Sequence, residues 1–389
     1  MCRFVVYLGE PLTLDMLITK PANSLIHQSF HAEMRQPLNG DGFGIAWYPA
    51  AKFGSEPAVF RAVTPAWNNL NLINLARVTQ SECILAHVRA ASPGMPVSES
   101  NCHPFVYGPF SFMHNGSVAR FHKLKRSLIA RLSDEAFHSV VGSTDSAHLF
   151  ALFLDSWADS KQEDPLVRIS EALQMTVETT VMLLRDHGIT EESQINLAVA
   201  DGKHVVACRY TTGDVKLAPS LYWHEGKRYV CRKGVVYMVD PVTDPDAPGT
   251  TKETVIIASE PLSDDYGWEL VEPNSLVLIG EDRRVHLERL PDWGFSASGH
   301  PAHLDDAVNQ FYHIEASGHA AAEGASTIGE PGGRTLVHYT TAGEHKDFAQ
   351  HSHPANRAPH SADEPHRDHG HTHAAPPATS AVTKETPEE

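Results

Sequence analysis

Cys2 is the residue around which the chemistry of this sequence can be organised. Once the initiator Met1 is removed, as a small second residue generally permits, Cys2 carries both a thiol nucleophile and a free α-amine. That amine has a pKa of about 7.7–8.0, so it can take up a proton near neutral pH. A nucleophile with a base within hydrogen-bonding distance is the minimum apparatus for acyl transfer. Taken alone, however, Cys2 is better explained as a small apolar residue packed in a core.

Asn115 and Gly116 directly follow an expected strand at residues 110–114. Attack on an amide carbonyl builds negative charge on its oxygen, and two preorganised hydrogen-bond donors stabilise that charge. The side-chain amide of Asn115 and the backbone N–H of Gly116 can supply both donors. The alternative is an ordinary Asn-Gly turn.

Arg89 and Asp145 are the candidate binding residues. Arg89 ends an expected strand, and its guanidinium can hold a carboxylate through two hydrogen bonds; the alternative is a surface salt bridge. Asp145 begins an expected helix and can accept hydrogen bonds from an ammonium group; the alternative is a plain N-cap. Together they suit the α-carboxylate and α-ammonium of a glutamyl group, whose γ-carbonyl is then left for Cys2.

Three histidines, His87, His103 and His114, lie close to these motifs in the sequence. We interpret them as structural hydrogen-bonding residues, because the α-amine of Cys2 already fills the role of base.

Apolar periodicity and turn residues predict sheets covered by helices, which is an α+β arrangement in layers. The first strand, residues 2–8, is expected to end at Gly9, before a short apolar segment that Pro11 opens. The other expected strands are residues 43–48, 84–89, 110–114, 195–200, 205–210, 229–231, 235–239, 255–258 and 275–279. The expected helices are residues 24–30, 68–78, 118–131, 133–141, 145–157 and 165–187.

The net charge of -17 argues against a nucleic-acid partner, because phosphate binding requires a basic surface. Five widely spaced cysteines without a Cys-x-x-Cys pair suit a reducing compartment. We find no secretory signal and no apolar stretch long enough for a membrane helix. The expectation is therefore a cytoplasmic protein with no membrane partner.

Residues 300–389 differ in composition from the rest of the chain. They hold thirteen of the 25 histidines among Gly, Ala, Pro, Ser and Thr, and they show little periodicity. We expect a largely disordered tail, because so little apolar surface cannot offset the entropy lost on ordering. The histidines of residues 366–373 can bind a divalent metal weakly, although a solvated tail with incidental metal affinity is the simpler interpretation.

Six short motifs together resemble those of the class II glutamine amidotransferases, which are N-terminal-nucleophile hydrolases. The motifs are MCRF at residues 1–4, NGDGFG at 39–44, HVRA at 87–90, NCHPF at 101–105, HNG at 114–116 and GSTDS at 142–146. ASEPL at residues 258–262 resembles a later segment of the same family. The motifs cover residues 2 to about 157, and the resemblance implies a four-layer αββα sandwich. We place the end of this domain at residue 299, where the composition changes, so that residues 300–389 lie outside it.

By this resemblance Cys2 is both nucleophile and base, and Asn115 and Gly116 form the oxyanion hole. Arg89 and Asp145 would bind the glutamyl α-groups, and no metal or cofactor is implied. Ala147 departs from the family pattern, which usually has Glu after Ser-Thr-Asp-Ser.

Residues 21–26 and 64–69 further resemble one fungal branch of this family. Its members are the amidotransferase-like subunits of a glutathione-degradation complex, and they have a metallopeptidase-like partner. The resemblance implies hydrolysis of the γ-glutamyl amide of glutathione through a cysteine thioester. The alternatives are a glutaminase, an amidotransferase or a hydrolase of another γ-glutamyl amide, and a non-catalytic subunit that binds γ-glutamyl ligands.

Overall fold

The computed structural model describes residues 2–31, 38–92, 94–239, 253–264, 266–291 and 293. The predicted tail at residues 300–389, its boundary and the histidines of residues 366–373 lie outside these ranges and stay predictions. None of the described helices is both long and apolar enough to cross a bilayer.

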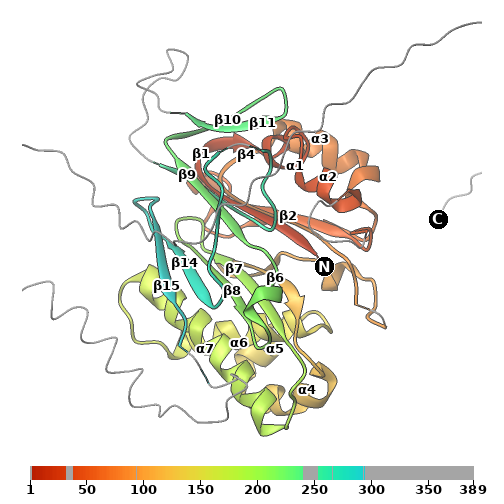
Figure 1. Ribbon diagram of the computed structural model, residues 1–389, viewed down its shortest axis with the longest axis vertical. Helices are drawn as coiled ribbons and strands as arrows, with labels where there is room; N and C mark the ends of the chain where they lie inside the picture. The colour runs from red at the N-terminus through yellow and green to blue at the C-terminus, as the bar shows by residue number, and fades with distance from the viewer. Residues whose placement is uncertain are drawn as a thin grey trace, which may run out of the picture. The chain divides into compact units, whose positions relative to one another are not determined.

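Two antiparallel sheets form the centre of the described structure (Figure 1). The seven-stranded sheet has the order β13-β9-β12-β1-β4-β2-β3, and the six-stranded sheet has the order β15-β14-β8-β7-β6-β5. The first contains β1 (Arg3–Thr13), β2 (Phe43–Trp47), β3 (Ala58–Ala62), β4 (Gln80–Val88), β9 (Tyr222–Gly226), β12 (Thr254–Ala258) and β13 (Glu269–Leu270). The second contains β5 (Phe105–Tyr107), β6 (Phe110–Ser117), β7 (Gln194–Ala200), β8 (Val205–Thr211), β14 (Ser275–Ile279) and β15 (Val285–Arg289).

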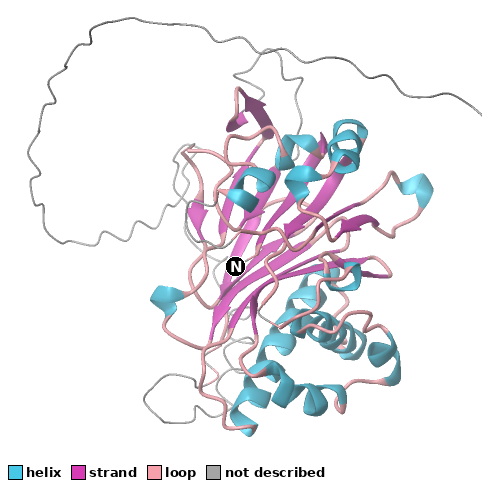
Figure 2. Cartoon of the chain, turned by 90° about the vertical axis from the view of Figure 1, so that its right-hand side faces the viewer, coloured by secondary structure: helices cyan, strands magenta, loops and turns pink. Residues whose placement is uncertain are grey.

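Helices cover the outer face of each sheet, and a separate hairpin pairs β10 (Arg228–Arg232) with β11 (Val235–Val239). The helices are α1 (Asp15–Ile18), α2 (Leu25–Phe30), α3 (Leu70–Val78), α4 (Phe121–Ile129), α5 (Asp134–His138), α6 (Asp145–Asp159) and α7 (Pro165–Asp186). Figure 2 shows strands in the middle and helices on both sides. The predicted four-layer αββα sandwich is confirmed.

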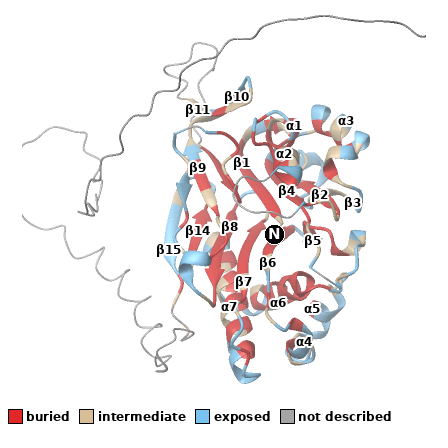
Figure 3. Cartoon of the chain, turned by 45° about the vertical axis from the view of Figure 1, so that its right-hand side comes forward, coloured by how far each residue is buried: buried red, intermediate tan, exposed pale blue. Residues whose placement is uncertain are grey.

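The alternation of side chains along β1 explains why two layers can pack against one strand, since successive residues point to opposite faces of a sheet. Phe4 and Val6 belong to the apolar core between the two sheets. Val5 and Tyr7 belong to the core under α1, α2 and α3. Strands buried on both faces therefore run through the centre of the molecule (Figure 3).

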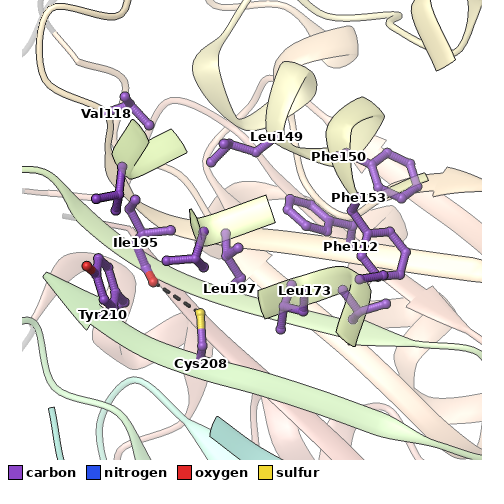
Figure 4. Close-up of a cluster of buried hydrophobic side chains, with 14 of the residues drawn as sticks. Phe112, Val118, Leu149, Phe150, Phe153, Leu173, Ile195, Leu197, Cys208 and Tyr210 are labelled. Atoms are coloured by element: carbon purple, nitrogen blue, oxygen red, sulfur yellow. Dashed lines mark hydrogen bonds between the residues drawn. The ribbon is translucent and has the colours of Figure 1, made fainter. Parts of the chain in front are cut away.

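Aromatic and aliphatic side chains fill the space between the second sheet and its helices (Figure 4). Phe112 of β6 stacks on Phe150 of α6 with ring centroids 5.1 Å apart. Leu173 of α7 and Leu197 of β7 lie in the same cluster and are fully buried. This packing holds α6 and α7 against the second sheet.

Two expected strand ends are wrong. β1 passes through Gly9 and Pro11 to Thr13, because its pairing with β4 shifts register between Leu8 and Leu12. Such an irregularity tolerates a proline that has no N–H to donate. β6 continues through Asn115 and Gly116, which pair with β7 and form no turn.

Five short strands were not expected from the sequence: β3, β5, β9, β13 and β15. All but β9 lie at an edge of a sheet, and β9 is next to an edge. Most of β15 is exposed, and β3 is only partly buried, so neither requires the strong apolar alternation that signals a strand.

A buried ion pair joins the start of β1 to the segment after β12. Val5 pairs with Ala258, so Arg3 lies opposite Glu260. The Nε and Nη2 atoms of Arg3 lie 2.7 and 2.6 Å from Oε1 of Glu260, and both side chains are buried. Nη1 of Arg3 also donates to the carbonyl of Cys2 at 3.0 Å. The ion pair therefore holds the backbone at Cys2.

We expect Glu260→Gln to lower the free energy of unfolding by about 3–5 kcal/mol, because it removes the buried negative charge that contacts Arg3. Urea denaturation measures this change. The control is Glu281→Gln, which breaks a solvent-exposed contact with Lys203 and should leave the unfolding midpoint nearly unchanged. Equal effects of the two substitutions would contradict the structural role of the buried pair.

Candidate active site

Strand register places Cys2 beside the end of β4. Arg3 pairs with Val88, so Cys2 lies opposite Arg89. The backbone N–H of Ala90 lies 3.4 Å from Sγ of Cys2, and Sγ lies 3.5 Å from the carbonyl oxygen of Ala90. Two hydrogen bonds to one backbone residue therefore orient the thiol.

A cavity of about 540 Å³ opens next to Cys2. Its lining includes Cys2, Arg89, Gly116 and Asp145. The structure thus brings together four of the five residues singled out in the sequence, which lie just before β1, just after β4, in β6 and at the start of α6. Asn115 is buried behind Gly116 and is not part of the lining.

Arg89 is a buried cation, with only 4% of its surface exposed. Nη1 lies 3.5 Å from the carbonyl of Asp41, and Nη2 lies 3.2 Å from the carbonyl of Pro96. Within the described part of the chain no carboxylate lies within 4.0 Å of its guanidinium. The alternative of a surface salt bridge is therefore wrong.

Asp145 is a buried anion that also lines the cavity, 8% exposed. Thr144 provides the N-cap of α6, since its Oγ1 accepts the N–H of Ala147 at 3.3 Å. Asp145 instead accepts the N–H of Val118 at 2.8 Å and that of Ser146 at 2.9 Å. The plain N-cap alternative is therefore wrong for Asp145, and Ala147 leaves the cap intact.

No cationic group of the described residues forms a salt bridge with Asp145, just as none of their carboxylates pairs with Arg89. Burial of an ion without a partner costs several kcal/mol, even after relaxation. Two such ions of opposite sign on one cavity suit a ligand that carries both charges.

Asn115 and Gly116 lie where the two sheets meet. The Nδ2 group of Asn115 donates to Oγ of Ser259 at 3.3 Å, and the same oxygen accepts the N–H of Phe4 at 3.0 Å. Gly116 has φ +152°, and a Cβ atom there would lie 1.8 Å from the carbonyl oxygen of Gln194. Only glycine therefore fits this wall of the cavity. Ser259 was missed as a site residue, although its ASEPL segment had been recognised.

The neighbouring histidines differ from one another. His114 forms the expected hydrogen bonds, with Ser146 Oγ at 2.9 Å and the Gln194 carbonyl at 3.2 Å. The His103 ring lies 4.3 Å from that of His87, and neither His103 nitrogen has a hydrogen-bond partner among the described residues. The expected hydrogen-bonding role is therefore wrong for His103. Burial lowers the pKa of His103 well below its ordinary value and that of His87 to about 3, so both rings are neutral.

Burial raises the pKa of the Cys2 thiol, although the N–H of Ala90 and the charge of Arg89 act in the opposite direction. The thiol is therefore protonated near neutral pH and requires a base in order to attack. Among the described residues, no group of three or more His, Cys, Asp or Glu side chains is placed to hold a metal ion.

Comparisons with known proteins show the family to which the chain is similar. Residues 14–291 match the family of class-II glutamine amidotransferases. The chain is 40% identical over 298 residues to the "probable glutamine amidotransferase DUG3" of Saccharomyces cerevisiae, across 72% of this chain and 82% of the yeast protein. It is 26% identical over 282 residues to the gamma-glutamyl-hercynylcysteine sulfoxide hydrolase of Mycobacterium tuberculosis, across 72% of this chain and 93% of that protein.

A solved structure is similar as well. The glutamine aminotransferase class-II domain protein of Silicibacter pomeroyi has a TM-score of 0.50 and 26% identity, over 75% of this chain and 100% of its own.

The buried histidine pair predicts a loss of stability in acid. The pKa of His87 is about 3 in the folded chain and about 6.5 unfolded, so only the unfolded chain takes up a proton between these values. Above about pH 6.5 the protonation of His87 does not affect the free energy of unfolding. Below that pH, proton uptake by the unfolded chain lowers the free energy of unfolding as the pH decreases toward 3, at up to about 1.4 kcal/mol per pH unit.

His87→Phe keeps an aromatic ring against His103 but cannot be protonated. We expect its unfolding free energy, measured in urea from pH 8 to pH 4, to fall less steeply than that of the wild type. The difference measured at pH 8 serves as the internal reference. Parallel curves for the two proteins would show that His87 does not carry this pH dependence.

Proposed function

The chain belongs to the class II glutamine amidotransferases, and on that premise we propose that it hydrolyses the γ-glutamyl amide bond of glutathione through a thioester on Cys2. The supporting observation is the pair of buried charges, Arg89 and Asp145, on the cavity that Cys2 lines. A glutamyl group carries an α-carboxylate for Arg89 and an α-ammonium for Asp145. Bound in this way, it presents its γ-carbonyl to Cys2.

The first half-reaction needs a proton acceptor for the Cys2 thiol. In the processed chain this is the α-amine of Cys2 itself, which takes the S–H proton as sulfur attacks the γ-carbonyl carbon. The oxygen becomes negatively charged, and the Gly116 N–H and the Asn115 amide are its donors. Ser259 accepts one of the two Asn115 N–H bonds, and because Asn115 does not line the cavity, the proposed role requires its second N–H to reach the oxyanion from beside Gly116.

The tetrahedral intermediate collapses when the Cys2 ammonium returns the proton to the departing nitrogen. The C–N bond breaks, the amine product leaves, and the glutamyl group stays on sulfur as a thioester. Water then attacks the same carbon and gives a proton to the regenerated amine. The C–S bond breaks, sulfur recovers the proton, and glutamate is released.

The choice of glutathione rests on the resemblance to the fungal branch that degrades it. The M. tuberculosis relatives are, by name, hydrolases of another γ-glutamyl compound. A metallopeptidase-like partner and a cytoplasmic location are part of the same proposal. The location is supported by the cysteines, all five of which are free.

Two alternatives lead to different observations. An enzyme for glutamine or another γ-glutamyl amide would use the same α-group contacts but would prefer that substrate in a rate comparison. Retention of Met1 would favour a non-catalytic subunit, because the Cys2 amine would then be acylated and could not act as a base. Intact-mass measurement of the N-terminus distinguishes this second alternative from catalysis.

We expect Cys2→Ala to abolish release of glutamate from glutathione, because it removes the atom that attacks. The assay uses the pure protein, alone and with its metallopeptidase-like partner, and includes glutamine and a γ-glutamyl model amide. The matched control is Cys231→Ala, since Cys231 is also free and half-buried but does not line the cavity. If none of these substrates releases glutamate, either with or without the partner, the proposal is wrong.

We expect Arg89→Lys and Asp145→Asn to raise KM by roughly 10- to 100-fold, the value of a charged hydrogen bond, with a much smaller change in kcat. The α-groups are bound equally in substrate and transition state, so their loss mainly weakens binding. Removal of the α-amino group from a γ-amide substrate should lower kcat/KM less for Asp145→Asn than for the wild type. An unchanged KM in either variant counts against that residue's role.

A further inference from the structure

The charges that line the cavity exceed what a glutamyl group can use. Besides Arg89 and Asp145, the lining contains two permanent cations, Arg120 and Lys125. A bound glutamyl zwitterion would compensate Arg89 and Asp145 but neither of these. The remainder of the cavity is therefore positively charged.

Arg120 already has a partner. Its Nε lies 2.7 Å from Oε1 of Glu191, and both side chains are about half exposed. Lys125 forms no salt bridge within the described chain. Of these two cations, Lys125 is therefore the one that forms no salt bridge with a described carboxylate.

The packing of α4 directs Lys125 toward the cavity. Phe121, Leu124 and Leu128 form the buried stripe of this helix and pack in the core of the second sheet. Lys125 is half-buried and His122, one turn before it, is exposed, yet both line the cavity. Since Arg89 and Asp145 are deeply buried, α4 forms the outer part of the cavity and they form the inner part.

This arrangement orients a substrate. With the α-groups in the inner part and the scissile bond at Cys2, the leaving group is left with the more exposed part of the lining, which contains Lys125 as well as residues of the loop after β4. Ammonia, the leaving group of glutamine, gains nothing from a cation there. A peptide with a free C-terminal carboxylate gains an ion pair. A cavity of about 540 Å³ has room for such a leaving group, since pockets for drug-sized ligands measure about 300–1,000 Å³.

We infer that Lys125 binds the carboxylate of the leaving group and makes the enzyme selective for γ-glutamyl peptides with a free C-terminal carboxylate. The inference rests on the proposed function and adds the residue that sets its substrate class. Lys125 acts on binding and on the choice of substrate, and the bond-breaking steps at Cys2 proceed without it.

The test compares kcat/KM for glutathione, for glutathione amidated at its C-terminus, and for glutamine. We expect the wild type to favour the free acid over the amide by roughly three- to twentyfold, the range for a partly exposed charged hydrogen bond. Lys125→Met should abolish this preference and leave the rate on glutamine unchanged. Lys125→Arg should retain the preference, Lys125→Glu should reverse it, and added salt should weaken it in the wild type.

Lys123→Met is the matched control, because Lys123 is an exposed lysine of the same helix that does not line the cavity. It should behave as the wild type does. Equal rates on acid and amide in the wild type, or an unchanged preference in Lys125→Met, would overturn the inference while the Cys2 chemistry still stood. If none of the three substrates yields glutamate in a Cys2-dependent way, the proposed function itself fails.

Discussion

The pairing of β1 with β4 on one side and β12 on the other is the constraint on which the site depends. Pairing with β4 places Cys2 opposite Arg89 and next to the N–H of Ala90. Pairing with β12 places Arg3 opposite Glu260 in a buried ion pair. A shift of one residue would turn the Cys2 side chain to the other face of the sheet, away from the cavity. The register of β1 therefore places Cys2 beside Arg89, whereas Asn115 and Gly116 come from β6 of the other sheet.

The second requirement is that two ions remain buried without partners. Arg89 and Asp145 lose most of their hydration and are held by backbone groups, such as the Pro96 carbonyl and the Val118 N–H. An internal salt bridge would be more stable in the empty protein but would leave nothing for a ligand. Stability is given up in return for a preorganised site, which is the usual relation between strained functional groups and the packing around them.

Much of this could be predicted from the sequence, because the motifs mark local structure. Arg89 at a strand end and Asp145 at a helix start were both correctly placed. Asn115 and Gly116 were expected just after a strand, with a turn as the alternative, because the Asn-Gly signal does not reveal that β7 lies alongside. Ser259 and Lys125 were not singled out, since the contact of Ser259 with Asn115 and the position of Lys125 on the cavity arise only when distant segments meet in the folded chain. The local sequence predicts helices and strands, whereas strand register and the packing of the two sheets decide which side chains meet.

The central claim is that the mature chain begins at Cys2 and carries the glutamyl group on its sulfur during turnover. Acid quenching of the reaction with glutathione, followed by mass spectrometry of the N-terminal peptide, tests it directly. The account predicts a peptide that starts at Cys2 and bears a glutamyl thioester, which decays as glutamate appears. A peptide that retains Met1, or glutamate release with the adduct on another residue, would contradict it.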